Sequence, residues 1–390
     1  MKHNWKYLSI GECFPSIKNG ANIKQIAGAN GYPITRIETL SGGIFNRDRM
    51  GYANIVDLTK YQDYILESGD LLLSHINSKA YIGRTVKYEK QGDEKIIHGM
   101  NLLLLRANPE VISSSLFAYY SKSMKFKDAV ARIRKDAVNQ SSMAISDLRK
   151  IVVPVPPLEE QSRIVAELDL LTGIIDKQNA QLKELDNLAQ AIFYDMFGDP
   201  IKNEKGWCIK TLENIGKCIS GGTPSRKNAE FFEGSINWYS AGELNSLYLE
   251  ESIEKITETA LNESAAKLCK ANSLFIGMYD TAAFKLGITK TEAASNQACA
   301  NVFPKEDNVI WLYFVLSIMR DEALKYRHGA RQKNLNLGFI KSFSVPVPPL
   351  SFQQSFAEKI QSIEKQKETI RASIADTQKL LDYTMDKYFG

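Results

Sequence analysis

The chain has 390 residues, of which 44% are hydrophobic and 24% charged, and its formal net charge is +4. This composition excludes a disordered or collagen-like chain and allows two globular domains with additional helices. The opening residues are polar, and the longest apolar run, Ile310 to Leu316, is too short to cross a bilayer. We therefore expect a cytoplasmic protein without a membrane partner. The five cysteines show neither metal-ligand spacing nor a disulfide framework, which fits a reducing compartment.

Residues 1–150 are predicted to form a globular domain of mixed helices and strands. A short amphipathic segment comes first, from Trp5 to Gly11, and a strand is expected at Gly69–Ser74. An aromatic-rich helix is expected at Leu116–Lys135. The domain has 22 Lys and Arg against 14 Asp and Glu, a net charge of +8. This excess of positive charge suits a phosphate backbone as partner.

Candidate DNA-contacting side chains of this domain lie around Ser41–Gly43, just after the expected strand and near the end of the expected helix. Arg forms paired hydrogen bonds with guanine, Asn and Gln do so with adenine, and Lys and Arg also hold phosphates. A solvated helix end or loop is the simpler explanation for any one of these residues, so each assignment stays open. The candidates are Arg36, Arg47, Arg49, His75, Asn77, Lys79, Arg134, Asn139 and Gln140.

Residues 151–198 are predicted to be a rigid extended segment followed by one long helix. The segment Val153–Leu158 reads Val-Pro-Val-Pro-Pro-Leu, and each proline fixes φ and keeps the preceding residue out of the helical region. Apolar residues then recur at alternating spacings of four and three, a heptad seam in which Gln178 is the only polar residue. The net charge of residues 151–200 is −6, which suits a protein partner. The seam consists of Ile164, Leu168, Leu171, Ile175, Leu182, Leu185, Ala189, Ile192 and Met196.

Residues 199–342 are predicted to form a second mixed domain, whose elements follow an order similar to that of the first. It also opens with an amphipathic segment, Trp207–Gly216, and an expected strand at Asn272–Gly277 and helix at Trp311–Tyr326 follow. Its candidate DNA-contacting residues lie in a flexible, basic, hydroxyl-rich loop, among small residues before the helix, and after the helix. They are Thr223, Ser225, Arg226, Lys227, Asn296, Gln297, Arg327, Arg331, Gln332, Lys333 and Asn334.

Residues 343–390 repeat the extended segment and the long helix at an offset of 192 residues, without a gap. Only 11 of the 46 aligned pairs are identical, so the two copies agree in length and in the spacing of their motifs more than in residue identity. About 39 residues follow each proline motif, which predicts two rods of roughly 60 Å. We expect the two helices to pair antiparallel, although packing on their own domains or on another subunit remains open. The second seam consists of Phe356, Ile360, Ile363, Lys367, Ile370, Ile374, Thr377, Leu381, Thr384 and Tyr388.

Motifs for catalysis are missing from the sequence. It has no Gly-x-x-x-x-Gly-Lys-Ser/Thr loop, no Asn/Asp/Ser-Pro-Pro-Tyr/Phe tetrapeptide of an amino-methyltransferase, and no Glu-x-Lys of a common nuclease metal site. The four histidines are far apart and lack ligand spacing. The sequence therefore favours a binding protein that is not an enzyme by itself and holds no metal.

The repeated Val-Pro-Val-Pro-Pro-Leu-x-x-Gln motif, which ends at Gln161 and Gln353, occurs with a long helix, a Phe-Gly ending and two dissimilar domains. Together these features resemble the specificity subunits of type I restriction-modification systems, and the resemblance spans the whole chain. The Gly-Gly-Thr-Pro-Ser loop at 221–225 and Asn296-Gln297 also resemble recurrent features of such domains. The first domain departs from both patterns.

The resemblance implies an α+β protein with approximate two-fold symmetry. Two globular α/β target recognition domains, residues 1–150 and 199–342, would each read one half of a bipartite site in double-stranded DNA. The central region 151–198 and the distal region 343–390 would form an antiparallel coiled-coil spacer that sets the half-site spacing and docks two copies of a modification (methyltransferase) subunit. That subunit would bind S-adenosylmethionine, and a restriction subunit, where present, would use ATP and Mg. This chain would bind no cofactor.

Two other interpretations remain open from the residues alone. A scaffold protein could use the coiled coil to join two protein-binding domains without DNA. An enzyme with an active site assembled from distant residues would also leave no sequence motif.

Overall fold

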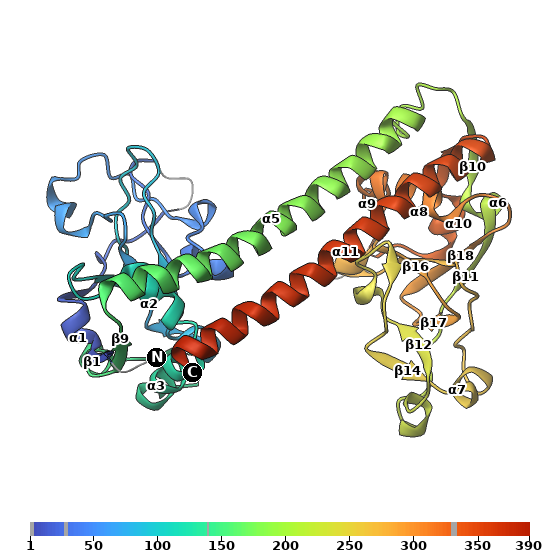
Figure 1. Ribbon diagram of the computed structural model, residues 1–390. Coiled ribbons are helices and arrows are strands. Elements are labelled where there is room, and N and C mark those ends of the chain that lie inside the picture. The colour runs from blue at the N-terminus through green and yellow to red at the C-terminus, as the bar shows by residue number, and fades with distance from the viewer. Residues whose placement is uncertain (1–3, 27–29, 139, 329–333) are drawn as a thin grey trace. The chain divides into compact units, whose positions relative to one another are not determined.

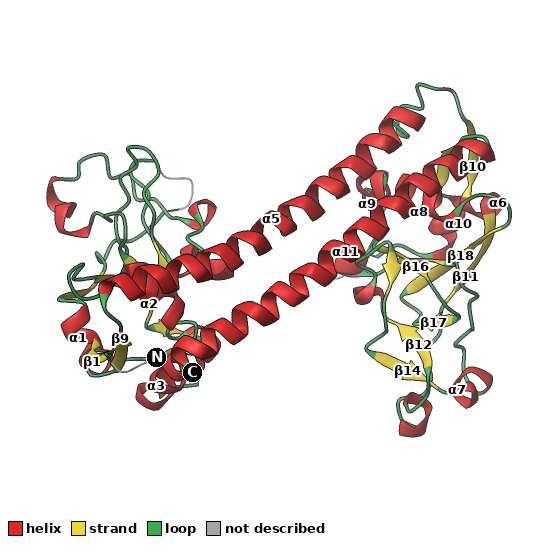
Figure 2. Ribbon diagram, viewed as in Figure 1, coloured by secondary structure: helices red, strands yellow, loops and turns green. Residues whose placement is uncertain are grey.

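The computed structural model describes residues 4–26, 30–138, 140–328 and 334–390. The chain forms two compact units, one comprising residues 1–178 and 372–390 and the other residues 179–371. Each unit contains one mixed domain of helices and strands and half of each of two long helices (Figures 1 and 2). The predicted mixed fold with two long helices is therefore confirmed. Within the described ranges, no helix has an apolar stretch that would span a bilayer.

A four-stranded antiparallel sheet with the order β2-β6-β3-β5 forms the core of the first unit. Successive side chains of a strand point to opposite faces, and the leucines of β3 and β6 are buried on both. Leu71 and Leu103 pack with the aromatic residues of two helices, whereas Leu72 and Leu104 pack on the opposite face with Tyr88. The strands are β2 (Ser16–Asn19), β3 (Leu71–Ser74), β5 (Thr85–Lys87) and β6 (Leu102–Arg106).

A second, smaller sheet of the first unit has the order β4-β8-β7 and is antiparallel throughout. Its strands are β4 (Ile76–Asn77), β7 (Lys135–Asp136) and β8 (Ser141–Ser142). The α-helices of this domain are α1 (Ile10–Cys13), α2 (Ser114–Tyr120), α3 (Met124–Ile133) and α4 (Ile145–Leu148). Its 3₁₀ helices are η1 (Ile37–Gly43), η2 (Arg47–Arg49), η3 (Thr59–Tyr64) and η4 (Lys79–Tyr81).

The second unit contains a five-stranded sheet with the order β11-β18-β15-β16-β13 and a three-stranded sheet with the order β14-β12-β17. The strands are β11 (Gly216–Ser220), β12 (Ile236–Tyr239), β13 (Tyr248–Leu249), β14 (Glu254–Ile256), β15 (Leu274–Gly277), β16 (Leu286–Thr289), β17 (Ala293–Ser295) and β18 (Cys299–Pro304). The helices are α6 (Leu212–Ile215), η5 (Ala229–Phe232), η6 (Ala241–Glu243), α7 (Glu258–Asn262), η7 (Asp280–Ala282), α8 (Val309–Ile318), α9 (Arg320–Leu324) and α10 (Leu337–Ser342).

Each proline motif begins within a β-strand that pairs with the strand at the start of its own domain. In the first unit β1 (Lys6–Ser9) is antiparallel to β9 (Val152–Val155), and Leu8 faces Val153. In the second, β10 (Cys208–Thr211) is antiparallel to β19 (Ser344–Val347), and Lys210 faces Val345. The incoming and outgoing strands of each domain therefore lie side by side immediately before a long helix.

The two long helices are α5 (Leu158–Phe197) and α11 (Leu350–Phe389). In the first unit the beginning of α5 packs against the end of α11, so that Ile164 and Leu168 share a buried cluster with Tyr388 and Phe389. In the second unit the end of α5 packs against the beginning of α11, where Phe193 contacts Phe356 at a ring-centroid distance of 5.6 Å. The helices are thus antiparallel within each unit.

The seam residues occupy the less exposed side of both helices. The buried ones on α5 are Ile164, Leu168, Leu171 and Ala189, and the half-buried ones are Ile175, Leu182, Leu185, Ile192 and Met196. On α11 the buried ones are Phe356, Ile360, Ile363, Lys367, Thr384 and Tyr388, and the half-buried ones are Ile370, Ile374, Thr377 and Leu381.

Each aromatic-rich segment forms two helices, where the sequence predicted one. In the first domain the break lies between α2 and α3, where the Ser123 hydroxyl accepts a hydrogen bond from the backbone N–H of Phe126 and caps α3. In the second domain α8 ends before Met319 and α9 ends at Leu324, short of the predicted Tyr326.

Candidate nucleic-acid interface

Two of the predicted segments of the second domain meet at one end of the five-stranded sheet, where β11 ends and β18 begins. The backbone N–H of Gly221 donates to the Cys299 carbonyl (3.0 Å), and that of Gly222 donates to the Ser295 carbonyl (2.9 Å). The Thr223 hydroxyl donates to the side-chain oxygen of Gln297. A Cβ at Gly221 would lie 2.2 Å from the Asn296 carbonyl oxygen, so only glycine allows this approach. The loop and the Asn296-Gln297 pair therefore form one polar surface.

Arg226 is held in place beside this surface. Its guanidinium lies over Phe232 at 4.4 Å and Trp238 at 5.3 Å, measured to the ring centroids. It also donates to Glu254, with Nη2 and Oε2 2.7 Å apart, and this hydrogen bond lowers the pKa of Glu254. Part of its charge is thus neutralised within the domain. Ser225 and Lys227 are exposed on the same loop.

A third segment, at Asn334 and Leu335, joins the same end of the sheet. The backbone N–H of Met278, just after β15, donates to the Ala298 carbonyl (2.8 Å), and that of Leu335 donates to the Met278 carbonyl (2.7 Å). The Asn334 side-chain oxygen accepts the backbone N–H of Asp280 at 2.9 Å. The segment of Asn334 and that of Gln297 are therefore both bonded to Met278 or its neighbours, although the two residues are 37 positions apart in the sequence.

The remaining candidates of this domain have different placements. Arg327 is half-buried and its Nε donates to the Leu324 carbonyl at 3.2 Å, so its guanidinium helps to close the end of the helix. Arg331, Gln332 and Lys333 lie outside the described residues.

The first domain brings several of its predicted residues together at the small β4-β8-β7 sheet. Arg134 Nε lies 2.6 Å from Asp136 Oδ1, and Lys79 Nζ lies 3.7 Å from Asp136 Oδ2. The hydrogen bond from Arg134 lowers the pKa of Asp136 to about 2. Asn77 is half-buried and donates to Ser74 Oγ at 3.1 Å, and Gln140 is exposed. This edge is therefore polar and basic.

His75 differs from its predicted role as a surface contact. Its residue is only 6% exposed, because it continues the buried strand β3, and burial lowers the pKa of the imidazole to about 4. The side chain is thus a neutral core residue in this structure. Asn139 lies outside the described residues.

The three arginines near Ser41–Gly43 lie on η1 and η2 or beside them. Arg36 and Arg49 are exposed, and Arg36 Nε lies 3.3 Å from Glu38 Oε2. Arg47 is half-buried against the rings of Phe45 and Tyr88, and it donates to Glu94 at 2.6 and 3.0 Å. Hydrogen bonding from Arg47 lowers the pKa of Glu94 to about 2. Arg47 therefore fastens two segments of the domain to each other.

The candidate interfaces of the two domains occupy equivalent positions in a shared backbone frame. In the first domain the backbone N–H of Ser74 donates to the Arg84 carbonyl at 2.9 Å, and that of Gly83 donates to the Ser74 carbonyl at 2.8 Å. In the second domain the backbone N–H of Gly277 donates to the Lys285 carbonyl at 2.8 Å, and that of Phe284 donates to the Gly277 carbonyl at 2.7 Å. The bond from Met143 to His75 (2.9 Å) likewise matches that from Leu335 to Met278. The side chains presented on the two frames differ.

Sequence reasoning missed the buried polar network beneath the second interface. Ser295 Oγ donates to Asn301 Oδ1 at 2.9 Å, and Asn301 Nδ2 lies 3.3 Å from the sulfur of Cys269. Asn301 is fully buried. The one available signal was an asparagine within the otherwise apolar strand Cys299–Pro304. The network fixes Ser295, whose carbonyl holds the loop at Gly222.

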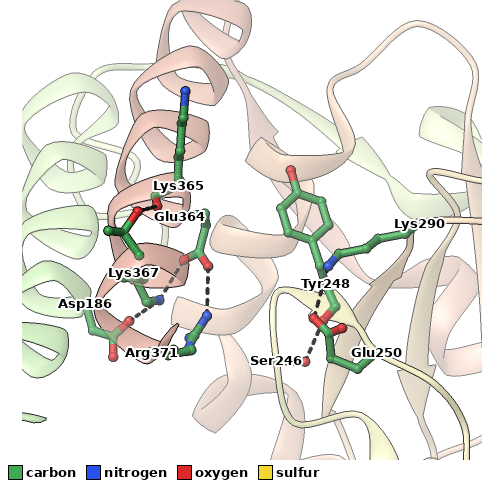
Figure 3. Close-up of polar contacts among 10 residues, drawn as sticks. Asp186, Ser246, Tyr248, Glu250, Lys290, Glu364, Lys365, Lys367 and Arg371 are labelled. Carbon is green, nitrogen blue, oxygen red and sulfur yellow. Dashed lines mark hydrogen bonds and ion pairs between the residues drawn. The ribbon is translucent and has the colours of Figure 1, made fainter. Parts of the chain in front are cut away.

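A cavity of about 660 Å³ in the second unit lies where α5, α8 and α11 meet the loop before β13 (Figure 3). Lys367 lines it and is 8% exposed, with Nζ 2.7 Å from Asp186 Oδ1 and 2.6 Å from Glu364 Oε1. Lys290, across the cavity, lies 3.0 Å from Glu250. Acidic and basic side chains are nearly balanced here, so the cavity is not suited to a polyanion. The ionisable lining residues are Asp186, Glu250, Glu364, Glu368, Lys290, Lys367 and Arg371.

Among the described residues, no group of three or more His, Cys, Asp or Glu side chains is arranged to hold a metal ion. Burial raises the pKa of the Cys13, Cys269 and Cys299 thiols to about 12, so these thiols are protonated at neutral pH and are poor nucleophiles. Cys208, in contrast, is exposed.

Comparisons with known proteins agree with this architecture. The family model for the type I restriction modification DNA specificity domain matches residues 2–187 and 204–376. A Methanocaldococcus jannaschii protein described as the type I restriction enzyme MjaX specificity subunit is 29% identical over 384 residues, covering 93% of this chain and 87% of that protein. The EcoR124I/EcoR124II specificity subunit of Escherichia coli is 30% identical over 226 residues, 54% of each chain.

Solved structures show the same fold. The S subunit of a type I restriction-modification system from M. genitalium superposes with a TM-score of 0.59 at 14% identity, covering 99% of this chain and 96% of that one. A chain from a study of complex assembly in a type I restriction-modification system gives a TM-score of 0.56 at 16% identity, with 99% and 97% covered. With two matches to the specificity model, one on each half, the chain belongs to the family of type I restriction-modification specificity subunits, which recognise DNA sequences.

Proposed function

We propose that each domain of this chain reads one half of a bipartite DNA site and that the paired helices fix the distance between the two halves. The observation that carries this proposal is the hydrogen-bonded frame that occurs in both domains with different polar side chains at its edge. One scaffold with two sets of surface residues is suited to two different half-sites. The family membership favours DNA recognition over the alternative of a scaffold that joins proteins.

The long helices supply the stiffness that such a reader needs. B-DNA presents the same face about every 10 base pairs, so two half-sites are read together only at a set separation and rotation. The antiparallel packing within each unit and the ion pair of the buried Lys367 with Asp186 oppose sliding of one helix along the other. The intervening base pairs would be spanned and not read.

Partner subunits would carry out the chemistry. The central region is acidic, at −6 over residues 151–200, and its helix presents the exposed Leu170, Ile174 and Leu188 beside carboxylates. Such a surface suits a protein more than DNA. We assign to it the docking of two modification subunits, which would bind S-adenosylmethionine. ATP and Mg would belong to a restriction subunit, and this chain would be non-catalytic.

Replacing Gln297 with alanine is expected to relax base preference in one half-site. A bidentate side-chain contact contributes about 1–3 kcal/mol of discrimination, roughly 5- to 150-fold, and removing it leaves the phosphate contacts unchanged. The measurement is binding of the chain with its modification subunit to a library of duplexes. The matched control is Gln140→Ala in the first domain, which should affect only the other half-site. Unchanged preference in both would contradict these placements.

Lengthening the helix pair tests the spacing role. Gln178 Nε2 donates to Ser373 Oγ at 2.7 Å, so these positions face each other on α5 and α11. Four residues inserted after Gln178, with four before Ser373, add about 6 Å to both helices, close to two base-pair rises. Mapping of methylated sites in cells should then show the same half-sites at a larger separation. An unaltered separation would reject the spacing role, and substitution of four exposed residues there is the control.

A further inference from the structure

The first unit has a second basic surface next to the β4-β8-β7 edge. It is an open cavity of about 670 Å³ bounded by the Gly42-Gly43 turn, the segment before β5, and helix α3. Five basic side chains and one acidic side chain line it, in contrast to the balanced cavity of the second unit. These residues are Lys79, Arg84, Lys122, Lys127, Arg134 and Asp128.

The positive charge of this groove is only partly neutralised by the protein. Lys79 and Arg134 share Asp136, as described above. Arg84 lies over the Tyr81 ring at 4.3 Å and forms no ion pair with a described residue. Lys122 and Lys127 are exposed and form no direct ion pair within the described ranges. Burial lowers the pKa of Lys122, and the more distant carboxylates Asp176 and Asp169 of α5 offset part of this effect. An anion entering the groove would therefore meet several cations that do not have to give up an existing ion pair.

The opposite wall of the groove is exposed backbone. Gly42 and Gly43 have φ values of +72° and +75°, and a Cβ built at Gly43 would have no neighbour within 4 Å. A ligand can thus approach the peptide groups of this turn closely, as in backbone sites for phosphate groups. At the position equivalent to Gly83, the second domain has Phe284, which is 1% exposed, so this part of the wall is built differently in the two domains.

We propose that this groove binds the phosphodiester backbone of the DNA whose bases lie against the adjoining β4-β8-β7 edge. The proposal rests on the proposed function, because it assigns to the groove the same duplex. Lys122 and Lys127 make the main contacts, and Arg84 and the Gly42-Gly43 turn complete the site. The contact supplies affinity and register without reading sequence.

The test compares the full-length chain, assembled with its modification subunit, with its Lys122→Glu/Lys127→Glu variant on a random-sequence duplex and on its target duplex. Neutralising one phosphate contributes about 0.9 to the slope of log affinity against log salt, so loss of two contacts should lower the slope by about 2. We expect at least a tenfold weaker affinity at moderate salt for both duplexes, and unchanged base preference.

Two further variants make the result specific to the groove. Lys90→Glu/Lys95→Glu carries the same charge change on exposed lysines of the same domain that do not line the groove, and it should bind more tightly than the groove variant. Lys122→Arg/Lys127→Arg should retain the wild-type salt slope. Thermal unfolding of each variant checks that the domain is folded.

The outcomes separate the groove from the wider proposal. Wild-type affinity and salt slope in the folded Lys122→Glu/Lys127→Glu variant would overturn the groove assignment while leaving DNA recognition intact. Equal weakening by the Lys90→Glu/Lys95→Glu control would also overturn it, since the effect would then come from net charge alone. No DNA binding by the wild-type assembly would instead overturn the proposed function.

Discussion

Replacing Phe356 with alanine is expected to lower the free energy of unfolding of the second unit by about 3–5 kcal/mol, the usual cost of truncating a buried phenylalanine. The side chain is fully buried, and its ring centroid lies 5.6 Å from that of Phe193, 5.4 Å from Phe197 and 5.1 Å from Phe314. These partners come from α5 and α8, so one deletion leaves a cavity where both long helices join the domain.

Denaturant unfolding followed by circular dichroism measures this loss. Phe352→Ala is the matched control, one turn earlier on the same helix, where the side chain is 46% exposed and should cost less than about 1 kcal/mol. Equal losses in the two variants would contradict the packing described here. The same Phe356→Ala protein should also bind DNA with a less defined half-site separation.

Acidification from pH 7 to pH 5 is expected to destabilise the first unit by about 2 kcal/mol through His98 alone. This residue is fully buried, and desolvation lowers the pKa of its imidazole to about 4, an effect that the nearby backbone carbonyls of Lys18 and Leu102 offset only in part. Neither ring nitrogen has a well-formed hydrogen bond among the described residues. In the unfolded chain the imidazole titrates near its ordinary pKa of 6.5. As the pH falls below that value, the unfolded state takes up the proton first, and stability is lost until the pH approaches 4.

The measurement is the free energy of unfolding between pH 7 and pH 5, for the wild type and for His98→Leu, which removes the titrating group while filling most of its space. The variant should show a flatter pH dependence. His75 acts in the same direction and window, since burial also lowers its pKa to about 4. Glu94 and Asp136, whose pKa values are lowered to about 2, contribute only at lower pH. An identical pH slope in both proteins would show that His98 is not held neutral.

The helical seams were predictable because they depend on local periodicity. The spacing of four and three on each helix placed residues such as Ile164 and Ile360 on the protected side of α5 and α11. Phe193 and Phe197 do not belong to that pattern, yet both are buried, because the second domain packs on a different side of α5. A contact made by a distant part of the chain leaves no period in the sequence.

The sequence indicated which types of residue line the candidate interfaces, but not which of their side chains are free to contact DNA. The sequence showed arginines and lysines near loops, but not that Arg47 is paired with Glu94 or Arg226 with Glu254. Lys122, in the turn before α3, and Lys127, on α3, were missed because lysines in such a segment usually denote only a solvated surface. Their significance comes from the open turn at Gly42-Gly43 on the other wall of the groove, some 80 residues earlier.

The paired strands at the base of each domain have an evolutionary consequence. Since β1 lies beside β9 and β10 beside β19, the chain enters and leaves each domain at neighbouring points. A recombination event with its crossover points in two such strands would transplant an intact domain and leave the helix that follows in its original phase. New specificities are therefore accessible by exchange of whole modules, without the stepwise redesign of a single binding surface.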